Sequence, residues 1–307
     1  MKILVTGANG FLGQYLVRQA IAKNYIVTGI GKGPSRLIVA AMEGYSYFPI
    51  DITNGMELHT IIVAEKPDVI VHAAAMTQVD ECELNKQACY NVNVTATRFL
   101  IDAAKEINAK LVYISTDFVF DGESGPYKET DTPAPVNYYG SAKLVAEKAV
   151  MESGLEWAIA RTVLVYGLIN TQARKNIISF VKEKLEASET ISMVTDQWRT
   201  PTFVQDLARG ILVIIEKKAT GIFHLSGNQL ITPYEMAVET AKFFGLDESL
   251  IKKISSDELK QPGKRPARTG FIIDKAKKEL GFEPVSFEEG LKNIFLGGNE
   301  PSLTSNQ

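Results

Sequence analysis

The first half of the chain alternates short apolar runs with longer segments whose apolar residues recur at helical spacing. The runs are rich in β-branched residues, as buried parallel strands are, and lie at 2–6, 25–30, 47–50, 67–72, 110–115 and 157–161. Helices are predicted between them at 14–23, 54–65 and 85–107, and another begins at Asn137. This alternation, repeating roughly every 25–35 residues, predicts an α/β fold with a doubly wound parallel sheet.

After Gly167 the pattern becomes irregular and mostly helical. Further helices are predicted near 173–186, 204–217, 232–244, 274–280 and 287–295, and strands near 191 and at 221–225. We expect a dinucleotide-binding domain of residues 1–166, to which 203–226 return. Residues 167–202 and 227–296 would form a smaller, mostly helical substrate-binding lobe, with 297–307 as a loose tail.

A glycine-rich turn follows the first predicted strand. Gly7, Gly10 and Gly13 lie between that strand and a helical segment, with Phe11 and Leu12 among them. In this setting the glycines allow a tight turn and close approach of a pyrophosphate to the N-terminal end of the helix. The alternative is that they only turn the chain.

The loop after the second predicted strand carries positive charge. Folds that prefer NAD usually place Asp or Glu here to bind the ribose 2′-hydroxyl, and none is present. Lys32 and Arg36, with Ser35 between them, suit the 2′-phosphate of NADP(H). A solvated basic loop is the alternative.

Small and polar residues follow the fourth and fifth predicted strands. Ala73, Ala74 and Ala75 would let a flat ligand approach the backbone, although alanines also serve close helix–sheet packing. Thr116 stands at the carboxyl end of its strand, where open parallel sheets bind ligands. It could equally cap a turn.

Tyr139 and Lys143 are four residues apart on the helix that Asn137 would cap, so they share one face. A lysine close to the phenol would lower the pKa of the tyrosine by roughly 3 units, or about 4 kcal/mol, and make it a proton donor. With 11 Tyr in the chain, about one such spacing arises by chance. The alternative is an ordinary amphipathic helix with a solvated lysine.

The composition restricts the possible functions. With 45% hydrophobic and 22% charged residues, the 307-residue chain has a globular composition, and its net charge of −3 argues against binding nucleic acid or an acidic membrane. There is no run of 18 apolar residues and no room for a signal peptide before the first strand. Two cysteines and three scattered histidines predict neither disulfides nor a metal site and suit the cytoplasm.

Together these motifs resemble the extended short-chain dehydrogenase/reductase family, which has a Rossmann-type fold. The shared features are Thr-Gly-x-x-Gly-x-x-Gly at 6–13, Asp51, the alanines at 73–75, Asn93, Ser115-Thr116 and Tyr139-x-x-x-Lys143. Within it the chain is most similar to the dTDP-4-dehydrorhamnose reductases, through the segments 79–83, 115–122, 126–131, 201–208 and 265–266. One departure is Thr269 and Phe271, where these reductases favour Ser and Leu, and it leaves the exact sugar open.

The resemblance implies NADPH-dependent reduction of a 4-keto-6-deoxy sugar nucleotide, with dTDP-4-dehydrorhamnose converted to dTDP-L-rhamnose. Tyr139 would protonate the forming alkoxide, Thr116 would donate a second hydrogen bond, and Lys143 would bind the nicotinamide ribose. NAD(H) would be a possible second cofactor. The partner would be a small sugar nucleotide, and a homodimer is the assembly we expect.

The resemblance also implies the contacts of each ligand. Cofactor-binding residues would be Gly7, Gly10, Phe11, Leu12, Gly13, Lys32, Arg36, Asp51, Ile52, Ala73, Ala74, Ala75, Asn93 and Ser115. Substrate-binding residues would be Thr77, Val79, Asp117, Trp198, Arg199 and Arg265. An arginine (Arg199, Arg265 or Arg268) would meet the diphosphate, and Trp198 would stack on a base or sugar unless it belongs to the core.

Two other classes stay open. The first is an epimerase or dehydratase of the same family, although dehydratases commonly carry an acidic pair where this chain has Asp117-Phe118. The second is a non-catalytic binding module, since the regulatory β subunit of methionine adenosyltransferase also resembles these reductases.

Overall fold

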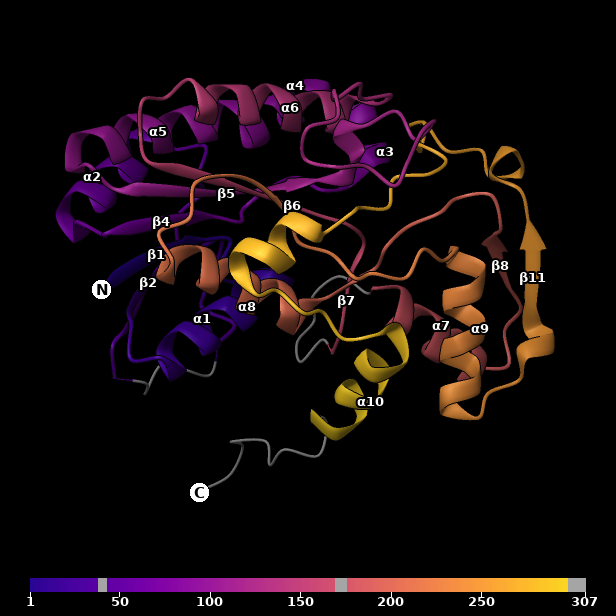
Figure 1. Ribbon diagram of the computed structural model, residues 1–307. Coiled ribbons are helices and arrows are strands. Elements are labelled where there is room, and N and C mark those ends of the chain that lie inside the picture. Colours follow the sequence, from indigo (N-terminus) through magenta and orange to yellow (C-terminus); the bar gives the residue numbers. More distant parts are fainter. Residues whose placement is uncertain (38–42, 169–175, 298–307) are drawn as a thin grey trace.

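The computed structural model describes residues 1–37, 43–168 and 176–297 and is built on a seven-stranded parallel sheet (Figure 1). The strand order is β10-β6-β5-β4-β1-β2-β3, which confirms the doubly wound α/β prediction. The strands are β1 (Lys2–Thr6), β2 (Ile26–Ile30), β3 (Tyr45–Phe48), β4 (Val69–His72), β5 (Lys110–Thr116), β6 (Trp157–Thr162) and β10 (Gly221–His224).

Helices cover both faces of this sheet, because its strands are apolar on both sides. Ile3 and Val5 of β1 pack toward α1 (Phe11–Ala22) and α8 (Val204–Glu216). The alternate residue Leu4 packs toward the other face, which is covered by α2 (Gly55–Glu65), α5 (Ala96–Ile107) and α6 (Tyr138–Met151). Two apolar cores, one on each face, therefore support the strand ends where the site lies.

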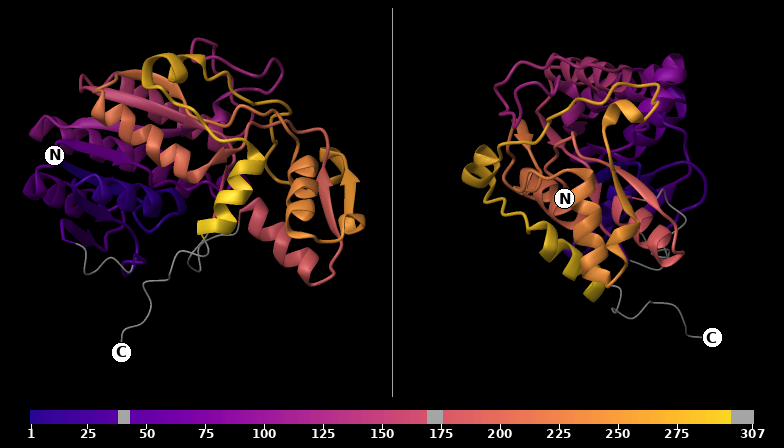
Figure 2. Two further views of the ribbon diagram at one scale, coloured as in Figure 1. Left: turned by 60° about the horizontal axis from the view of Figure 1, so that its bottom comes forward. Right: turned by 90° about the vertical axis from the view of Figure 1, so that its right-hand side faces the viewer.

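A second group of elements extends from one end of the sheet (Figure 2). Helices α7 (Ile177–Glu186) and α9 (Pro233–Phe244) pack with a small parallel pair, β8 (Ile191–Val194) and β11 (Ile251–Ile254). The helix α10 (Phe287–Gly297) contributes to a neighbouring apolar cluster. We propose that these elements form the substrate-binding lobe, while β10 joins the main sheet and α8 covers one of its faces.

The structure also contains short elements. They are α3 (Val79–Leu84), α4 (Lys86–Tyr90), β7 (Val165–Tyr166), β9 (Thr202–Phe203), the π-helices Asn91–Thr95 and Ala276–Leu280, and the 3-10 turns Asp117–Val119, Glu248–Leu250 and Ser256–Glu258. Of these, α3, β7 and the 3-10 turn after β5 contribute residues to the cavity described below. The strand β7 pairs in parallel with β9.

Several predicted boundaries are wrong. Helix α1 begins at Phe11, three residues before the predicted start, because the helix grows directly out of the glycine turn. The strand β3 lies two residues earlier than predicted and ends before Pro49, which has no N–H for the ladder. The predicted helix 85–107 is instead two α-helices, α4 and α5, which are joined by a π-helix. The predicted start near 173 and the tail after 297 lie outside the described residues.

Within the described ranges, no helix combines the length and the apolar character needed to cross a membrane.

Candidate active site

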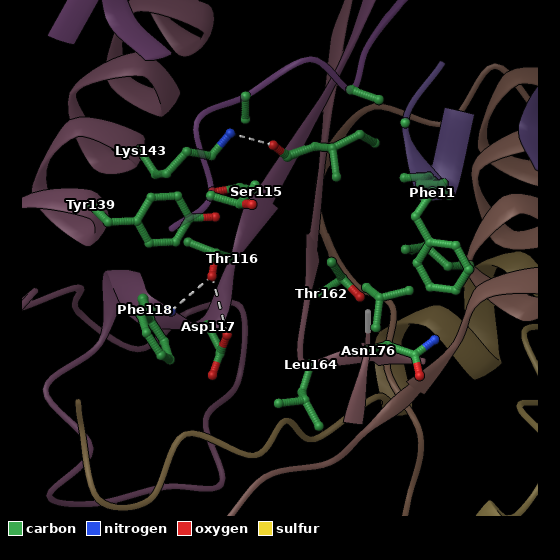
Figure 3. A pocket seen from close by; sticks show the side chains of 18 of the residues that line it. Phe11, Ser115, Thr116, Asp117, Phe118, Tyr139, Lys143, Thr162, Leu164 and Asn176 are labelled. Atoms are coloured by element: carbon green, nitrogen blue, oxygen red, sulfur yellow. Dashed lines mark hydrogen bonds between the residues drawn. The ribbon is translucent and has the colours of Figure 1, made fainter. Parts of the chain in front are cut away.

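A cavity of about 690 Å³ opens at the carboxyl ends of β1, β4 and β5 (Figure 3). It brings together most of the residues predicted from the sequence: Gly7, Gly10, Phe11, Leu12, Gly13, Arg36, Ala73, Ala75, Thr77, Val79, Ser115, Thr116, Asp117, Tyr139, Lys143, Arg199 and Arg265. Six predicted residues lie outside its lining: Lys32, Asp51, Ile52, Ala74, Asn93 and Trp198.

The glycine turn forms one wall and has space only for glycine. Gly7 has a φ of +72°, and a Cβ there would lie 2.8 Å from the backbone nitrogen of Ala74. A Cβ on Gly13 would lie 2.1 Å from the carbonyl oxygen of Gly7. Among the residues that the structure describes, no side chain caps the first turn of α1, which begins here. The turn therefore offers free N–H groups beside an uncrowded backbone, which fits a dinucleotide pyrophosphate.

The basic loop after β2 is organised by Asn9, which the sequence analysis did not select. Its Nδ2 donates to the carbonyl oxygens of Lys32 (3.0 Å) and Pro34 (2.9 Å), and its Oδ1 accepts from the Arg36 N–H (2.8 Å). Arg36 lines the cavity, whereas the Lys32 ammonium is paired with Asp51 at 2.8 Å. Ile52, which follows Asp51 in the sequence, is buried and packs in the apolar core.

A chain of hydrogen bonds supports the wall after β4. The Ala74 N–H donates to the Thr6 hydroxyl, which donates to His72 Nδ1, and His72 Nε2–H donates to Thr97. Thr97 donates in turn to the Asn93 carbonyl oxygen. Burial lowers the pKa of His72 to about 3, so the imidazole is neutral.

Asn93 itself is buried behind this wall. Its side chain accepts from the Met76 N–H and donates to the Met76 carbonyl oxygen, both at 3.0 Å. Asn93 and Ala74 therefore position the wall without facing the cavity.

Tyr139 and Lys143 both project from α6 toward the cavity, opposite the end of β5 (Figure 3). The helix begins as predicted, with Asn137 Oδ1 accepting from the Gly140 N–H at 2.8 Å. A Cβ on Gly140 would lie 2.0 Å from the Phe118 carbonyl oxygen, so this glycine lets α6 approach the segment after β5.

The hydroxyls at the end of β5 face Tyr139. Thr116 accepts from the Phe118 N–H at 3.2 Å and donates to Asp117 Oδ1 at 3.1 Å, so it caps a turn as well as lining the cavity. The buried Ser115 hydroxyl also lines the cavity and has no hydrogen-bond partner among the described residues. It is an available donor or acceptor for a ligand.

The predicted direction of the Tyr139 pKa is wrong for this structure. Burial raises the pKa of Tyr139, and a hydrogen bond with Thr116 opposes the rise only in part. The Lys143 ammonium instead donates to the Ile114 carbonyl oxygen at 2.7 Å and lies 4.1 Å from the centre of the Tyr113 ring. Burial lowers the pKa of Lys143 itself to about 7, against the opposing field of Glu147.

The predicted arginines are already paired on the other side of the cavity. Arg199 is buried, lies 3.8 Å from the Asp117 carboxylate and donates to the Pro266 carbonyl oxygen at 2.7 Å. Burial raises the pKa of Asp117, with Arg199 opposing. Arg265 binds the Asp80 carboxylate with two nitrogens.

Trp198 and Thr269 are two further residues of this region that the sequence analysis singled out. Trp198 lies outside the cavity, with the Arg268 guanidinium 5.8 Å from its ring centre. Thr269, where the reductases favour Ser, keeps a hydroxyl that donates to Asp117. Thr269 therefore still provides a hydroxyl at this position, as Ser would.

Other lining residues were missed by the sequence analysis. They are Asn9, Ile114, Phe118, Thr162, Leu164, Val165, Asn176, Gln197, Leu207 and Pro233. Thr162 stands at the carboxyl end of β6 and could have been found by the same argument as Thr116. Ile114, Leu207 and Pro233 lie on β5, α8 and α9, which were predicted as elements without a role in the site. The remaining residues come from short or irregular segments with no periodic pattern.

Comparisons with known proteins agree with this geometry. The family model described as the RmlD substrate binding domain matches residues 1–297. The dTDP-4-dehydrorhamnose reductase of Aggregatibacter actinomycetemcomitans is 31% identical over 305 residues, covering 95% of this chain and 98% of that protein. The methionine adenosyltransferase 2 subunit beta of Bos taurus is 34% identical over 265 residues, covering 84% of this chain and 76% of that protein.

A crystal structure of dTDP-4-dehydrorhamnose reductase from Bacillus anthracis in complex with NADP is also similar. The TM-score is 0.85 at 29% identity, and the alignment covers 96% of this chain and 99% of that one. These matches confirm the resemblance predicted from the motifs. The chain belongs to the RmlD substrate binding domain family, among the extended short-chain dehydrogenases/reductases.

Proposed function

We propose that the protein is an NADPH-dependent reductase of a 4-keto-6-deoxy sugar nucleotide, with dTDP-4-dehydrorhamnose reduced to dTDP-L-rhamnose. The observation that carries this proposal is the meeting of Tyr139, Thr116 and Lys143 in one cavity with the glycine turn. The names of the A. actinomycetemcomitans and B. anthracis relatives support the same reaction. NAD(H) is the second possible cofactor.

The cavity divides into a cofactor side and a substrate side. Gly7, Gly10 and Gly13 would hold the pyrophosphate, and Arg36 would meet the 2′-phosphate. Ser115 and Lys143 line the region between that wall and Tyr139. When bound, the nicotinamide cofactor supplies the hydride for reduction of the ketone.

Tyr139 is the general acid of this proposal. Its raised pKa keeps the phenol protonated at neutral pH, and the alkoxide that forms on reduction is basic enough to take the proton. Thr116 donates a second hydrogen bond to the same oxygen once its hydroxyl turns from Asp117. Lys143, on the same face of α6, would bind the hydroxyls of the nicotinamide ribose.

On the substrate side Arg265 would have to exchange Asp80 for a phosphate, because both its terminal nitrogens are engaged. Arg199 is buried and holds the carbonyl oxygens of the 266–267 segment. We therefore assign Arg199 to shaping the site and Arg265 to the diphosphate. Thr77 and Val79 would contact the sugar from the neighbouring wall.

The test is turnover of NADPH with a panel of dTDP-4-keto sugars. The parent protein should oxidise NADPH with at least one of them. Tyr139→Phe should lower kcat by roughly 10²–10⁴-fold while leaving the dissociation constant of NADPH within about twofold. Tyr138→Phe is the matched control, because that ring lies out of register with Lys143 and should keep parental kcat. Equal turnover by Tyr139→Phe would remove the catalytic assignment.

The regulatory-subunit alternative is kept because of the Bos taurus relative, whose identity to this chain is as high as that of the reductase. A protein that binds NADPH and turns over no keto sugar of the panel would favour it. A dehydratase is disfavoured because Phe118 lines the cavity where dehydratases commonly carry the second residue of an acidic pair. The homodimer and the cytoplasmic location stay predictions.

A further inference from the structure

Few groups near Lys143 stabilise the charged form of its side chain. The side chain is buried, and its ammonium donates a hydrogen bond to the Ile114 carbonyl oxygen at 2.7 Å. Glu147, one turn further along α6, binds Arg161 through both carboxylate oxygens, at 2.9 and 2.7 Å. A buried ammonium in such a place needs another source of stabilisation.

The aromatic ring of Tyr113 lies against this ammonium. Its ring lies on β5 one residue before Ile114, is 1% exposed, and has its centre 4.1 Å from Lys143 Nζ. The negative face of an aromatic ring attracts a cation, more strongly when both are desolvated. The contact therefore acts together with the Ile114 carbonyl oxygen on the same nitrogen.

A neutral group also packs against the Tyr113 ring. His72 packs against it with ring centres 5.5 Å apart, and hydrogen bonds to Thr6 and Thr97 hold both nitrogens of this imidazole. A charged imidazole there would repel the lysine. The titratable groups around Lys143 are Tyr139 and Glu147 on α6, Tyr113 on β5, His72 on β4, Cys82 on α3 and Cys89 on α4.

We propose that Tyr113 is a positioning residue for Lys143: its ring face keeps the ammonium charged and fixed where Tyr139 and the cofactor ribose need it. This inference rests on the proposed function for its consequence in catalysis. The contact itself is independent of that function. Since burial lowers the pKa of Lys143 to about 7, a small change in the ring contact alters the charge of the lysine at neutral pH.

The experiment measures the pKa of Lys143 directly, by NMR titration of protein labelled with ¹³C-lysine. Lys143→Arg identifies the resonance. Tyr113→Leu should lower this pKa by about one unit, whereas Tyr113→Phe, which keeps the ring, should leave it unchanged. NADPH affinity should fall about fivefold near pH 7 in Tyr113→Leu and recover toward the parental value near pH 5.5, where the lysine regains its proton.

A second series guards against misfolding of the leucine variant. Ring-fluorinated phenylalanines at position 113 keep the shape of the Tyr113→Phe side chain while weakening the negative face, so the pKa of Lys143 should fall stepwise with fluorine content. An unchanged pKa across both series would overturn the proposal. A changed pKa in a protein that reduces no keto sugar would keep the Tyr113 contact and remove the reductase assignment instead.

Discussion

Lys32 and Arg36 carry the same charge on the same loop but have different surroundings. The Lys32 ammonium is neutralised by Asp51, while Arg36 lines the cavity and its backbone is held by Asn9. Of these two cations, Arg36 is therefore the one placed to distinguish a 2′-phosphate from a hydroxyl. This refines the sequence interpretation, in which both were equally placed.

Arg36→Ala should reduce the preference for NADPH over NADH by roughly tenfold, since one charge-assisted contact on an exposed loop is lost. Lys32→Ala is the matched control and should change the preference less than threefold, on the order of a weak exposed ion pair. The measurement is the ratio of the two dissociation constants at two salt concentrations. Parental NADH binding as tight as NADPH binding would contradict the 2′-phosphate assignment.

Features of the site could be predicted from the sequence where they depend on residues close together in the chain. The shared face of Tyr139 and Lys143 and the Asn137 cap follow from neighbours within four residues, and the structure has both. The pKa of Tyr139 was not predictable, because it depends on burial by segments distant in sequence. The same holds for Arg265, whose partner Asp80 is 185 residues away.

At the scale of elements, α6 carries Tyr139 and Lys143, and a buried ion pair connects this helix to the sheet. Arg161 of β6 binds Glu147 of α6 with two nitrogens, and the two side chains are 2% and 0% exposed. Removing one partner leaves the other charge buried and unpaired. The pair therefore fixes how α6 lies on β6, and with it the height of Tyr139 above β5.

Glu147→Gln should lower the free energy of unfolding by about 3–5 kcal/mol, measured by chemical denaturation. Glu186→Gln is the control, because its ion pair with Lys182 is exposed on α7, and it should change stability by less than about 0.5 kcal/mol. Equal effects of the two substitutions would show that the buried pair does not anchor the helix.

Long elements with a clear period were predictable, and short ones were not. The seven strands of the main sheet and the helix from Asn137 follow from runs of apolar residues. The two-residue strands β7 and β9 carry no period that could reveal them. The strand β11 has the sequence Ile-Lys-Lys-Ile within a charged stretch, and this short segment shows no alternation that could reveal it.

At the scale of the whole molecule, two buried histidines make stability depend on pH. Burial lowers the pKa of His72 to about 3 and that of His224 well below its usual range. Each group is neutral in the folded protein but gains a proton in the unfolded chain below about pH 6.5. The unfolded state thus binds more protons, and stability falls as pH falls.

Between pH 6.5 and 5 the free energy of unfolding should therefore drop by about 2 kcal/mol for each histidine. Lys143 adds only a small slope in this window, because below its pKa of about 7 it is mostly protonated in the folded state and fully protonated in the unfolded chain. His72→Gln, which offers a donor and an acceptor to Thr97 and Thr6, should remove about half of the drop. Denaturation curves at several pH values test this prediction. If the free energy of unfolding dropped as much in His72→Gln as in the parent, His72 would not be a source of the pH dependence.

The central claim is that hydride passes from a nicotinamide cofactor to a sugar ketone in the cavity beside Tyr139. The most direct measurement is a single turnover with NADPH deuterated at the transferable C4 position and a dTDP-4-keto-6-deoxy sugar, followed by mass spectrometry and NMR of the product. The account predicts one deuterium on the former ketone carbon with the parent protein, and formation slowed by roughly 10²–10⁴-fold with Tyr139→Phe. Bound NADPH with no deuterium transferred to any sugar of the panel would contradict it.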